Sequence, residues 1–308
     1  MADSQIVVLG VGAIGGVVAA DLLDLGRADV RLVARTPFPE LVLDRPEGTS
    51  RHRIPAVGSP ADLSGDTPTD WVLLATKAHQ SPEARPWLDR LVGTRTRVAV
   101  LQNGIDQVER ISALAPAAQA VVPVVVQLPA ERRGPGHIWQ QRAGILMVPD
   151  DEDGRDFASL FADARTRVLP RRDFHTQAWW KLIMNAGSGA VCALVVRDNR
   201  AEHDPEIRAL VLALMREAAS VGRAEGAELP DDAPEKALDL ALSGAPGHWT
   251  SIAVDRREGR PMEWEARNAV IGRLGRRHGI PTPLSDMMTA LLRVADVSWT
   301  PDRGASDD

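Results

Sequence analysis

The sequence predicts an α/β N-terminal Rossmann-type doubly wound domain followed by an all-α C-terminal domain. Three observations carry this prediction. A glycine-rich turn follows an apolar run at the start of the chain, strand and helix patterns then alternate, and helical periodicity dominates the second half. The change in pattern places the domain boundary between residues 1–170 and residues 171–308.

The opening segment predicts a strand, a turn and a helix. Residues 6–9 form a short apolar run, which is typical of a buried strand, and the Ala/Leu-rich residues 17–25 favour a helix. The turn between them fits the dinucleotide-binding fingerprint GxGxxG, whose candidate residues are Gly10, Gly12, Ala13, Ile14 and Gly15. A turn that only opens a βαβ unit is the alternative, but the strand–turn–helix context favours a dinucleotide-binding Rossmann domain at residues 1–170. Residues 171–308 are expected to form the helical substrate and catalytic domain.

Each glycine of this turn has an expected role. Gly10 allows the tight turn, Gly12 lets the backbone approach a pyrophosphate, and Gly15 lets the helix pack on the strand. The helix N-terminus supplies unpaired N–H groups and a partial positive charge for the phosphates.

The end of the second expected strand, at residues 29–34, indicates which dinucleotide binds. An NAD site usually carries Asp or Glu about 20 residues after the glycines. Here the chain reads Val33-Ala34-Arg35-Thr36, without a carboxylate. Arg35 can pair with a 2′-phosphate, which favours NADPH/NADP+ as the cofactor, although a surface arginine is the alternative.

Two polar residues follow later strands of the predicted parallel sheet. Lys77 comes after a strand at 71–75, and Asn103 comes after a strand at 97–101. Ligands of such sheets bind outside the carboxyl ends of the strands, so both residues fall on the ligand edge. The alternatives are a helix-start surface charge for Lys77 and a plain Asn-Gly turn for Asn103. We also expect a helix at 82–92, strands at 120–128 and 166–169, and a hairpin formed by 136–140 and 144–148.

Lys181 is the strongest candidate in the second half. Only three of the 36 Lys and Arg residues are lysines, and unlike arginine a desolvated lysine can release its proton near neutral pH. Apolar residues flank Lys181, and Asn185 shares its helix face. Burial would lower the lysine pKa toward the range useful for acid catalysis, whereas a core helix whose lysine reaches solvent is the alternative. The helices expected here span 175–196, 205–226, 233–243, 262–278 and 284–296.

Composition excludes several classes of function. A net charge of −6 argues against a general nucleic-acid binder. No apolar run approaches the roughly 20 residues of a membrane span. The single cysteine, Cys192, excludes an intrachain disulfide, and no His/Asp/Glu cluster has metal-ligand spacing, so we expect no metal. These observations favour a cytoplasmic enzyme with a small-molecule substrate.

An ordered set of segments resembles the ketopantoate reductase (2-dehydropantoate 2-reductase) family over about residues 5–298. After the glycine fingerprint, the segments are Thr76-Lys77-Ala78, Gln102-Asn103-Gly104, Lys181-Leu182-Ile183-Met184-Asn185, Ser251 with Glu263 twelve residues later, and His278-Gly279-Ile280-Pro281-Thr282-Pro283. Taken alone, Ser251 is unremarkable and Glu263 is explained by the preference for acidic residues at helix starts.

The resemblance implies NADPH-dependent reduction of a 2-keto acid, with ketopantoate and pantothenate biosynthesis as the first candidates, by a protein that forms a homodimer. Lys181 would then donate the proton, and Glu263 would contact Lys181 or a substrate hydroxyl. Asn103 and Asn185 would orient the substrate and Lys181, and Ser251, Asn199 and His248 would bind the substrate. Lys77 would lie near the nicotinamide ribose, and Arg35 would contact the 2′-phosphate.

Two positions depart from the family pattern. Gly189 stands where the family usually has a second asparagine in the catalytic helix, and His248 stands at a position that is often Asn. A family paralogue that reduces a different ketone or an imine is therefore one alternative. A non-catalytic NADP(H) sensor is another, from a different class, although a sensor needs none of Lys181, Asn103 and Glu263.

Overall fold

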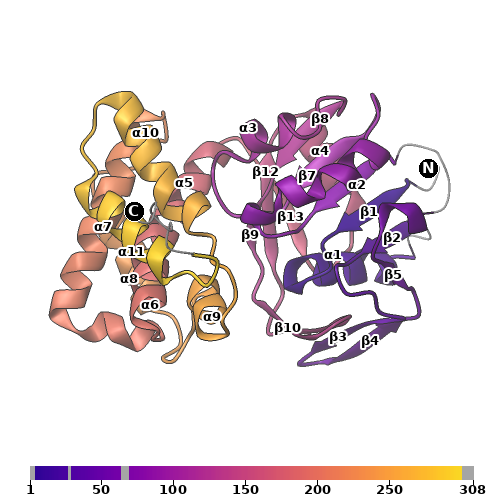
Figure 1. The fold of residues 1–308 in the computed structure, drawn as a ribbon, viewed down its shortest axis with the longest axis horizontal. Helices are drawn as coiled ribbons and strands as arrows, with labels where there is room; N and C mark the ends of the chain where they lie inside the picture. Colours follow the sequence, from indigo (N-terminus) through magenta and orange to yellow (C-terminus); the bar gives the residue numbers. More distant parts are fainter. Residues whose placement is uncertain (1–3, 27–28, 64–68, 300–308) are drawn as a thin grey trace, which may run out of the picture. The chain divides into compact units, whose positions relative to one another are not determined.

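The structure is a computed structural model that describes residues 4–26, 29–63 and 69–299. The chain divides into two compact units, Met1–Phe174 and His175–Asp308, called here the N-terminal and C-terminal units (Figure 1).

The N-terminal unit is built around a parallel sheet of six strands, in the order β5-β2-β1-β6-β7-β8 (Figure 1). The strand order reverses at β1, where β2 pairs on one side and β6 on the other, which is the switch point of a doubly wound sheet. This confirms the predicted fold class. The strands are β1 (Ile6–Leu9), β2 (Val30–Val33), β5 (Ala56–Val57), β6 (Trp71–Leu74), β7 (Arg97–Val100) and β8 (Ala120–Pro123).

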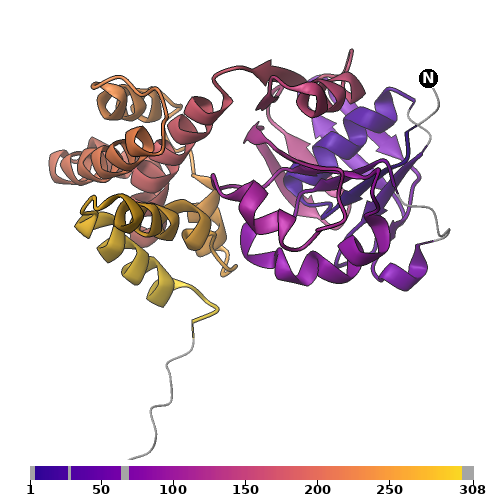
Figure 2. The same cartoon turned by 90° about the horizontal axis from the view of Figure 1, so that it is seen from above.

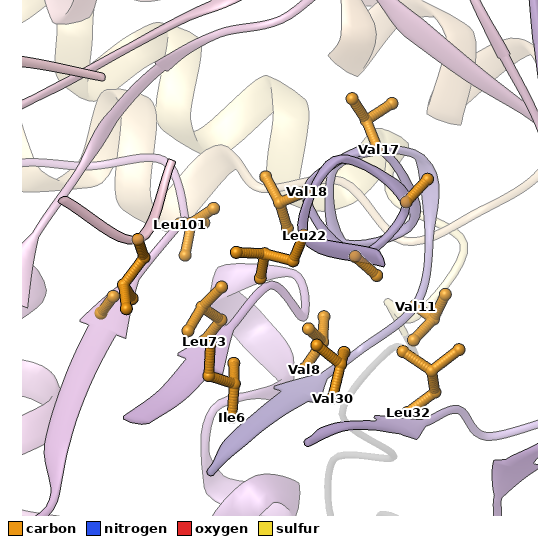
Figure 3. Packing of buried hydrophobic residues seen from close by; sticks show 14 of the residues in the cluster. Ile6, Val8, Val11, Val17, Val18, Leu22, Val30, Leu32, Leu73 and Leu101 are labelled. Atoms are coloured by element: carbon orange, nitrogen blue, oxygen red, sulfur yellow. The ribbon is translucent and has the colours of Figure 1, made fainter. Parts of the chain in front are cut away.

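Helices cover both faces of this sheet, and the side chains of β1 alternate between them. Ile6 and Val8 pack with Val18 and Leu22 of α1 in one core (Figure 3), whereas Val7 faces a second core on the opposite face. All four residues of β1 are buried, because a strand covered on both faces needs apolar side chains throughout. The first core also contains residues of α4 (Glu152–Leu160), and the second contains residues of α2 (Arg85–Leu91) and α3 (Gln107–Ser112), while α1 spans Ala13–Asp24.

Two smaller sheets complete the N-terminal unit, and they overturn two sequence predictions. The predicted hairpin is wrong, because β11 pairs antiparallel with β10, whereas β12 belongs to another sheet. The predicted strand at 120–128 is also wrong as one strand, since it divides into β8 and β9 in different sheets. Both segments have the predicted extended pattern, but strand partners depend on tertiary packing. The sheets are β10-β11-β3-β4 and β13-β12-β9, with β3 (Leu41–Arg45), β4 (Gly48–His52), β9 (Val125–Gln127), β10 (Ala130–Gly134), β11 (His137–Gln140), β12 (Ile145–Pro149) and β13 (Arg167–Arg171).

Short 3₁₀ turns connect several of these elements. The helix predicted at 82–92 forms as a 3₁₀ turn followed by α2. The turns in this unit are η1 (Pro60–Asp62), η2 (Ala78–Gln80) and η3 (Pro82–Ala84).

Every regular element among the described residues of the C-terminal unit is a helix or helical turn, as predicted (Figure 2). Its elements are α5 (Phe174–Met184), η4 (Asn185–Gly189), α6 (Ala190–Val195), η5 (Asn199–His203), α7 (Pro205–Ala224), α8 (Ala233–Leu242), α9 (Ser251–Arg257), η6 (Glu265–Ala269), α10 (Val270–His278) and α11 (Pro283–Ala295). The sequence analysis missed α9, because seven residues are too few to show a helical period.

Two of the predicted helices are interrupted by π-helical turns. The helix expected at 175–196 contains η4, and the helix expected at 262–278 contains η6. The two turns contact each other. Gly187 in η4 lies against α7, since a Cβ built there would lie 2.7 Å from Met215 Cγ. Single π turns within α-helices occur frequently at functional sites, so the side chains of η4 and η6 are candidates for a functional site.

Candidate active site

The glycine turn after β1 has the geometry of a phosphate-binding loop. Gly10 has a φ of +101°, and a Cβ there would lie 2.7 Å from the Thr76 nitrogen. A Cβ on Gly15 would overlap the Gly10 carbonyl oxygen. Apart from the local backbone, no described protein atom lies within 4 Å of a Cβ built on Gly12. The first and third glycines are therefore required by packing, whereas the second leaves open space beside the turn.

The start of α1 suits an anionic group. Gly12 is the N-cap and offers no side-chain acceptor, and the first turn, which contains Ala13 and Ile14, has no acidic residue. The backbone N–H groups and the positive end of the helix dipole are thus not satisfied by a local carboxylate. The residues present fit the phosphates of a dinucleotide.

The three other predicted cofactor residues follow the carboxyl ends of neighbouring strands. Arg35 follows β2, Lys77 follows β6, and Asn103 follows β7. Arg35 lies 3.7 Å from Glu83 (Nη2 to Oε2), and both side chains are more than 70% exposed. Such an exposed ion pair is weak, so the guanidinium can exchange it for a phosphate at little cost.

Gln102, which the sequence analysis did not select, ties these strand ends together. Its buried side chain donates from Nε2 to Thr76 Oγ1 at 3.0 Å. Its Oε1 accepts hydrogen bonds from Ser81 Oγ at 3.1 Å and Arg110 Nη2 at 3.0 Å. Gln102 therefore links the segment that contains Lys77 to the segment that contains Asn103. Its position directly before Asn-Gly was the one available signal.

The C-terminal unit brings four of the predicted residues around one buried arginine. Arg267, in η6, donates from Nη1 to Asn185 Oδ1 at 3.3 Å and from Nη2 to Ser251 Oγ at 2.8 Å. Its Nη2 also lies 3.7 Å from Glu263 Oε2. Lys181 is close enough to interact electrostatically with both Arg267 and Glu263. We call Lys181, Asn185, Ser251, Glu263 and Arg267 the lysine cluster.

Lys181 has the electrostatic environment of a proton donor at neutral pH. Desolvation is the larger of the two effects that lower the pKa of Lys181, and the positive charge of Arg267 is the smaller one. The carboxylate of Glu263 opposes both effects, and the resulting pKa is about 7, against 10.5 for an ordinary lysine. A general acid is most effective when its pKa lies near the working pH, so this lysine is suited to proton transfer.

Arg267 is the member of the cluster that the sequence analysis missed. It is 1% exposed, and burial lowers its pKa while the carboxylates of Glu263 and Asp255 act in the opposite direction. It remains protonated because an arginine keeps its charge even in unfavourable surroundings. The spacing of four from Glu263 was visible in the sequence, but it is also typical of a solvated ion pair on a helix surface.

Asn199 and His248, both predicted to bind substrate, meet each other in a loop. Asn199 is buried, and its Oδ1 accepts hydrogen bonds from the backbone nitrogens of Gly247 at 2.9 Å and His248 at 3.1 Å. Its Nδ2 donates to the Ala245 carbonyl at 3.1 Å. The His248 side chain is exposed. These hydrogen bonds hold the loop that precedes α9, and none of them reaches the lysine cluster.

The described residues contain neither a candidate metal centre nor a membrane-spanning helix. No group of three or more His, Cys, Asp or Glu side chains within residues 4–26, 29–63 and 69–299 could hold a metal ion. Over the same residues, no helix is long and apolar enough to cross a membrane.

Comparison with known proteins gives matches over nearly the whole chain. The family model for ketopantoate reductase PanE/ApbA matches residues 6–152, and the model for its C-terminal domain matches residues 173–296. A 2-dehydropantoate 2-reductase from Caulobacter vibrioides is 42% identical over 292 residues, which cover 95% of this chain and 99% of the relative.

Solved structures agree with this assignment. A 2-dehydropantoate 2-reductase from Geobacter metallireducens has a TM-score of 0.86 at 25% identity and covers 94% of this chain and 99% of its own. A dimeric ketopantoate reductase from Staphylococcus aureus has a TM-score of 0.84 at 25% identity and covers 94% of this chain and 98% of its own.

Proposed function

This chain belongs to the ketopantoate reductase family, and we propose that it reduces a 2-keto acid to the 2-hydroxy acid with NADPH, ketopantoate (2-dehydropantoate) to pantoate being the first candidate. It is an oxidoreductase that acts on a C=O/CH–OH pair. The observation that carries the proposal is the lysine cluster, in which a lysine of pKa about 7 lies among hydrogen-bonding side chains.

The lysine cluster accounts for the proton-transfer half of such a reduction. Bound NADPH would supply the hydride to the carbonyl carbon. The carbonyl oxygen then gains an electron pair and takes a proton from the Lys181 ammonium group, which leaves a neutral amine. Glu263 favours the protonated lysine before this step. Hydrogen bonds from Ser251 and Asn185 would hold the substrate, while a contact of Glu263 with a substrate hydroxyl remains a proposal from the family resemblance.

The choice of NADPH over NADH rests on Arg35. It follows β2 without a neighbouring carboxylate in the sequence, and its side chain is exposed. A guanidinium there is suited to a 2′-phosphate. Places for Lys77 beside the nicotinamide ribose and for Asn103 in orienting the substrate are proposed from the family resemblance.

The first experiment is NADPH oxidation by the purified protein with ketopantoate, followed by absorbance, with Lys181→Ala as the matched variant. We expect turnover that the substitution lowers by about 10²–10⁴-fold, the range of a lost general acid. NADPH binding should be retained in the variant. Unchanged activity of Lys181→Ala would exclude the assigned role of Lys181.

A paralogue that acts on another ketone or an imine is the second candidate, and Gly189 and His248 favour it. Absence of ketopantoate turnover with retained NADPH binding would support this candidate, and a panel of keto acids and imines would then identify the substrate. An NADP(H) sensor without catalysis is disfavoured by the lysine cluster, since a sensor has no use for a proton donor of pKa about 7.

We further propose a homodimer, by analogy with the dimeric Staphylococcus aureus enzyme, and a cytoplasmic location. Light scattering during size-exclusion chromatography would test the assembly, because a dimer has twice the 33.3 kDa mass of the chain.

A further inference from the structure

Arg267 determines whether Ser251 and Asn185, which are proposed to contact the substrate, act as hydrogen-bond donors or acceptors. A guanidinium has five N–H donors and no acceptor. Ser251 must therefore accept through Oγ, which leaves its hydroxyl proton for another partner. Asn185 must accept through Oδ1, which turns its NH₂ group away from the guanidinium. Because Arg267 can only donate, the Ser251 hydroxyl and the Asn185 NH₂ group are left to donate to another partner.

Gly189 lies beside the Arg267 guanidinium. A Cβ built on Gly189 would lie 3.5 Å from Arg267 Nη1 and 3.6 Å from Ile252 Cγ2. That is ordinary contact, so the atoms beyond Cβ of a larger side chain would compete with the guanidinium for the same space. Gly189 and Arg267 lie in the two contacting π turns, η4 and η6. Gly189, which departs from the family pattern, therefore leaves the space beside this helix open to the Arg267 guanidinium.

The charges around Arg267 favour an anionic partner. Arg267 is cationic, Lys181 is cationic while it holds its proton, and Glu263 is the carboxylate that interacts with both. Asp255 also acts on Arg267, but its Oδ1 accepts a hydrogen bond from Arg260 Nε at 3.0 Å, so that pair is close to neutral. Arg267 Nε, in addition, has no hydrogen-bond partner among the described residues. A buried cluster with an excess of positive charge gains stability when an anion binds.

We propose that Arg267 is a positioning residue, which fixes Ser251 and Asn185 as hydrogen-bond donors toward the carboxylate of a 2-keto acid and thereby makes the site select anionic substrates. This inference rests on the reductase activity proposed above. Arg267 acts through its neighbours, since it is itself almost fully buried.

The test compares ketopantoate with its lactone, which has the same ketone but no carboxylate. The variants are Arg267→Lys, which keeps an amine that can donate hydrogen bonds but removes the planar fork, and Arg267→Met, which removes every donor. Arg276→Met is the matched control, because Arg276 lies in the same unit in an exposed ion pair with Asp286. We expect both Arg267 variants to raise KM for ketopantoate by about 10-fold or more, the effect of losing hydrogen bonds supported by a charge. KM for the lactone should change by less than about 3-fold, and the control should resemble the wild type.

Two further readouts separate positioning from a general structural role. In a Ser251→Ala background, Arg267→Lys should change KM for ketopantoate much less than it does in the wild type, because the two residues act through one hydrogen bond. Arg267→Met should also move the alkaline fall of kcat/KM to higher pH, because the positive charge of Arg267 lowers the pKa of Lys181. Equal losses for the acid and the lactone, or additive effects with Ser251→Ala, would overturn the inference even if Arg267→Met alone does not fold.

Calorimetric titration with pantoate and with pantolactone measures the preference for the carboxylate as a difference in binding affinity, without turnover. If the wild type binds pantoate more tightly than pantolactone and Arg267→Lys abolishes this preference, the role of Arg267 is supported. That result would hold even if the wild type reduces no keto acid, and only the proposed function would then fail. An active wild type whose preference for the acid survives in Arg267→Lys would overturn the role of Arg267 alone.

Discussion

The glycine turn of the N-terminal unit and the lysine cluster of the C-terminal unit are built in opposite ways. In the turn, residues 10–15 act through the backbone, and the glycines leave room for it. In the cluster, side chains from α5, η4, α9, η6 and the residue Glu263 before it meet around Arg267. A site made of backbone can therefore be encoded by six consecutive residues, whereas a site made of charged side chains forms only when several segments of the unit meet on folding.

The two regions also handle charge differently. The start of α1 offers partial charges on backbone N–H groups that remain close to solvent. The lysine cluster holds full charges in a buried place, where each charge changes the pKa of its neighbours. We therefore expect substitutions in the cluster to change chemistry and pH dependence, and substitutions in the turn to change cofactor binding and stability.

The largest expected effect is the loss of activity at alkaline pH. Lys181 must be protonated to donate, and its pKa is about 7, so kcat/KM should fall about tenfold for each pH unit above that value. Below pH 7 the lysine is charged, and it should not limit the rate. Steady-state kinetics between pH 5.5 and 9.5, values chosen to bracket that pKa by about two units, would measure this. A profile that stays flat to the upper limit would contradict the pKa given for Lys181.

The next effect separates the glycines within the turn. Gly15→Ala places a methyl group against the Gly10 carbonyl, and we expect it to lower the free energy of unfolding by about 1–3 kcal/mol. Gly12→Ala meets no described protein atom, so it should leave the melting temperature unchanged and weaken only NADPH binding. Thermal unfolding and calorimetric binding on both variants would show the difference. Equal melting temperatures would contradict a packing requirement for glycine at position 15.

Arg35→Ala should have a smaller effect, confined to the cofactor. Loss of a charge-assisted hydrogen bond to the 2′-phosphate is expected to weaken NADPH binding by about tenfold and to leave NADH binding unchanged. Arg85→Ala is the matched control, because Arg85 is another exposed arginine in the same unit, paired with Asp89. If both cofactors weakened equally, Arg35 would not be the residue that distinguishes them.

The smallest effect concerns backbone strain. The left-handed position in the glycine turn is occupied by Gly10, but the one that ends α6 is occupied by Val196, with a φ of 52°. A β-branched residue is unfavourable there, so Val196→Asn should stabilise the protein by about 1 kcal/mol. Chemical denaturation would measure this gain. Activity should not change, and a loss of activity would show that the strain at Val196 serves the site.

Local patterns in the sequence were sufficient to predict the fold class. The parallel sheet, the helical second half and the turn at Gly10 and Gly15 follow from alternation, periodicity and glycine spacing, which act between near neighbours. Partners in the smaller sheets were not predictable, because β11 and β12 have the same extended pattern whichever strand they join. The π turns were also missed, since one extra residue in a helical turn leaves the apolar pattern nearly unchanged.

The candidate site shows the same division. Local sequence patterns predict that Lys181 and Asn185 lie on one helix and that Arg35, Lys77 and Asn103 follow strands. The burial of Arg267 between Asn185, Ser251 and Glu263, and the link that Gln102 makes between two strand ends, arise only from folding. The physical reason is that a pKa near 7 and a donor-only hydrogen bond depend on desolvation and distance. Both are set by segments that are far apart in the chain and meet only when it folds.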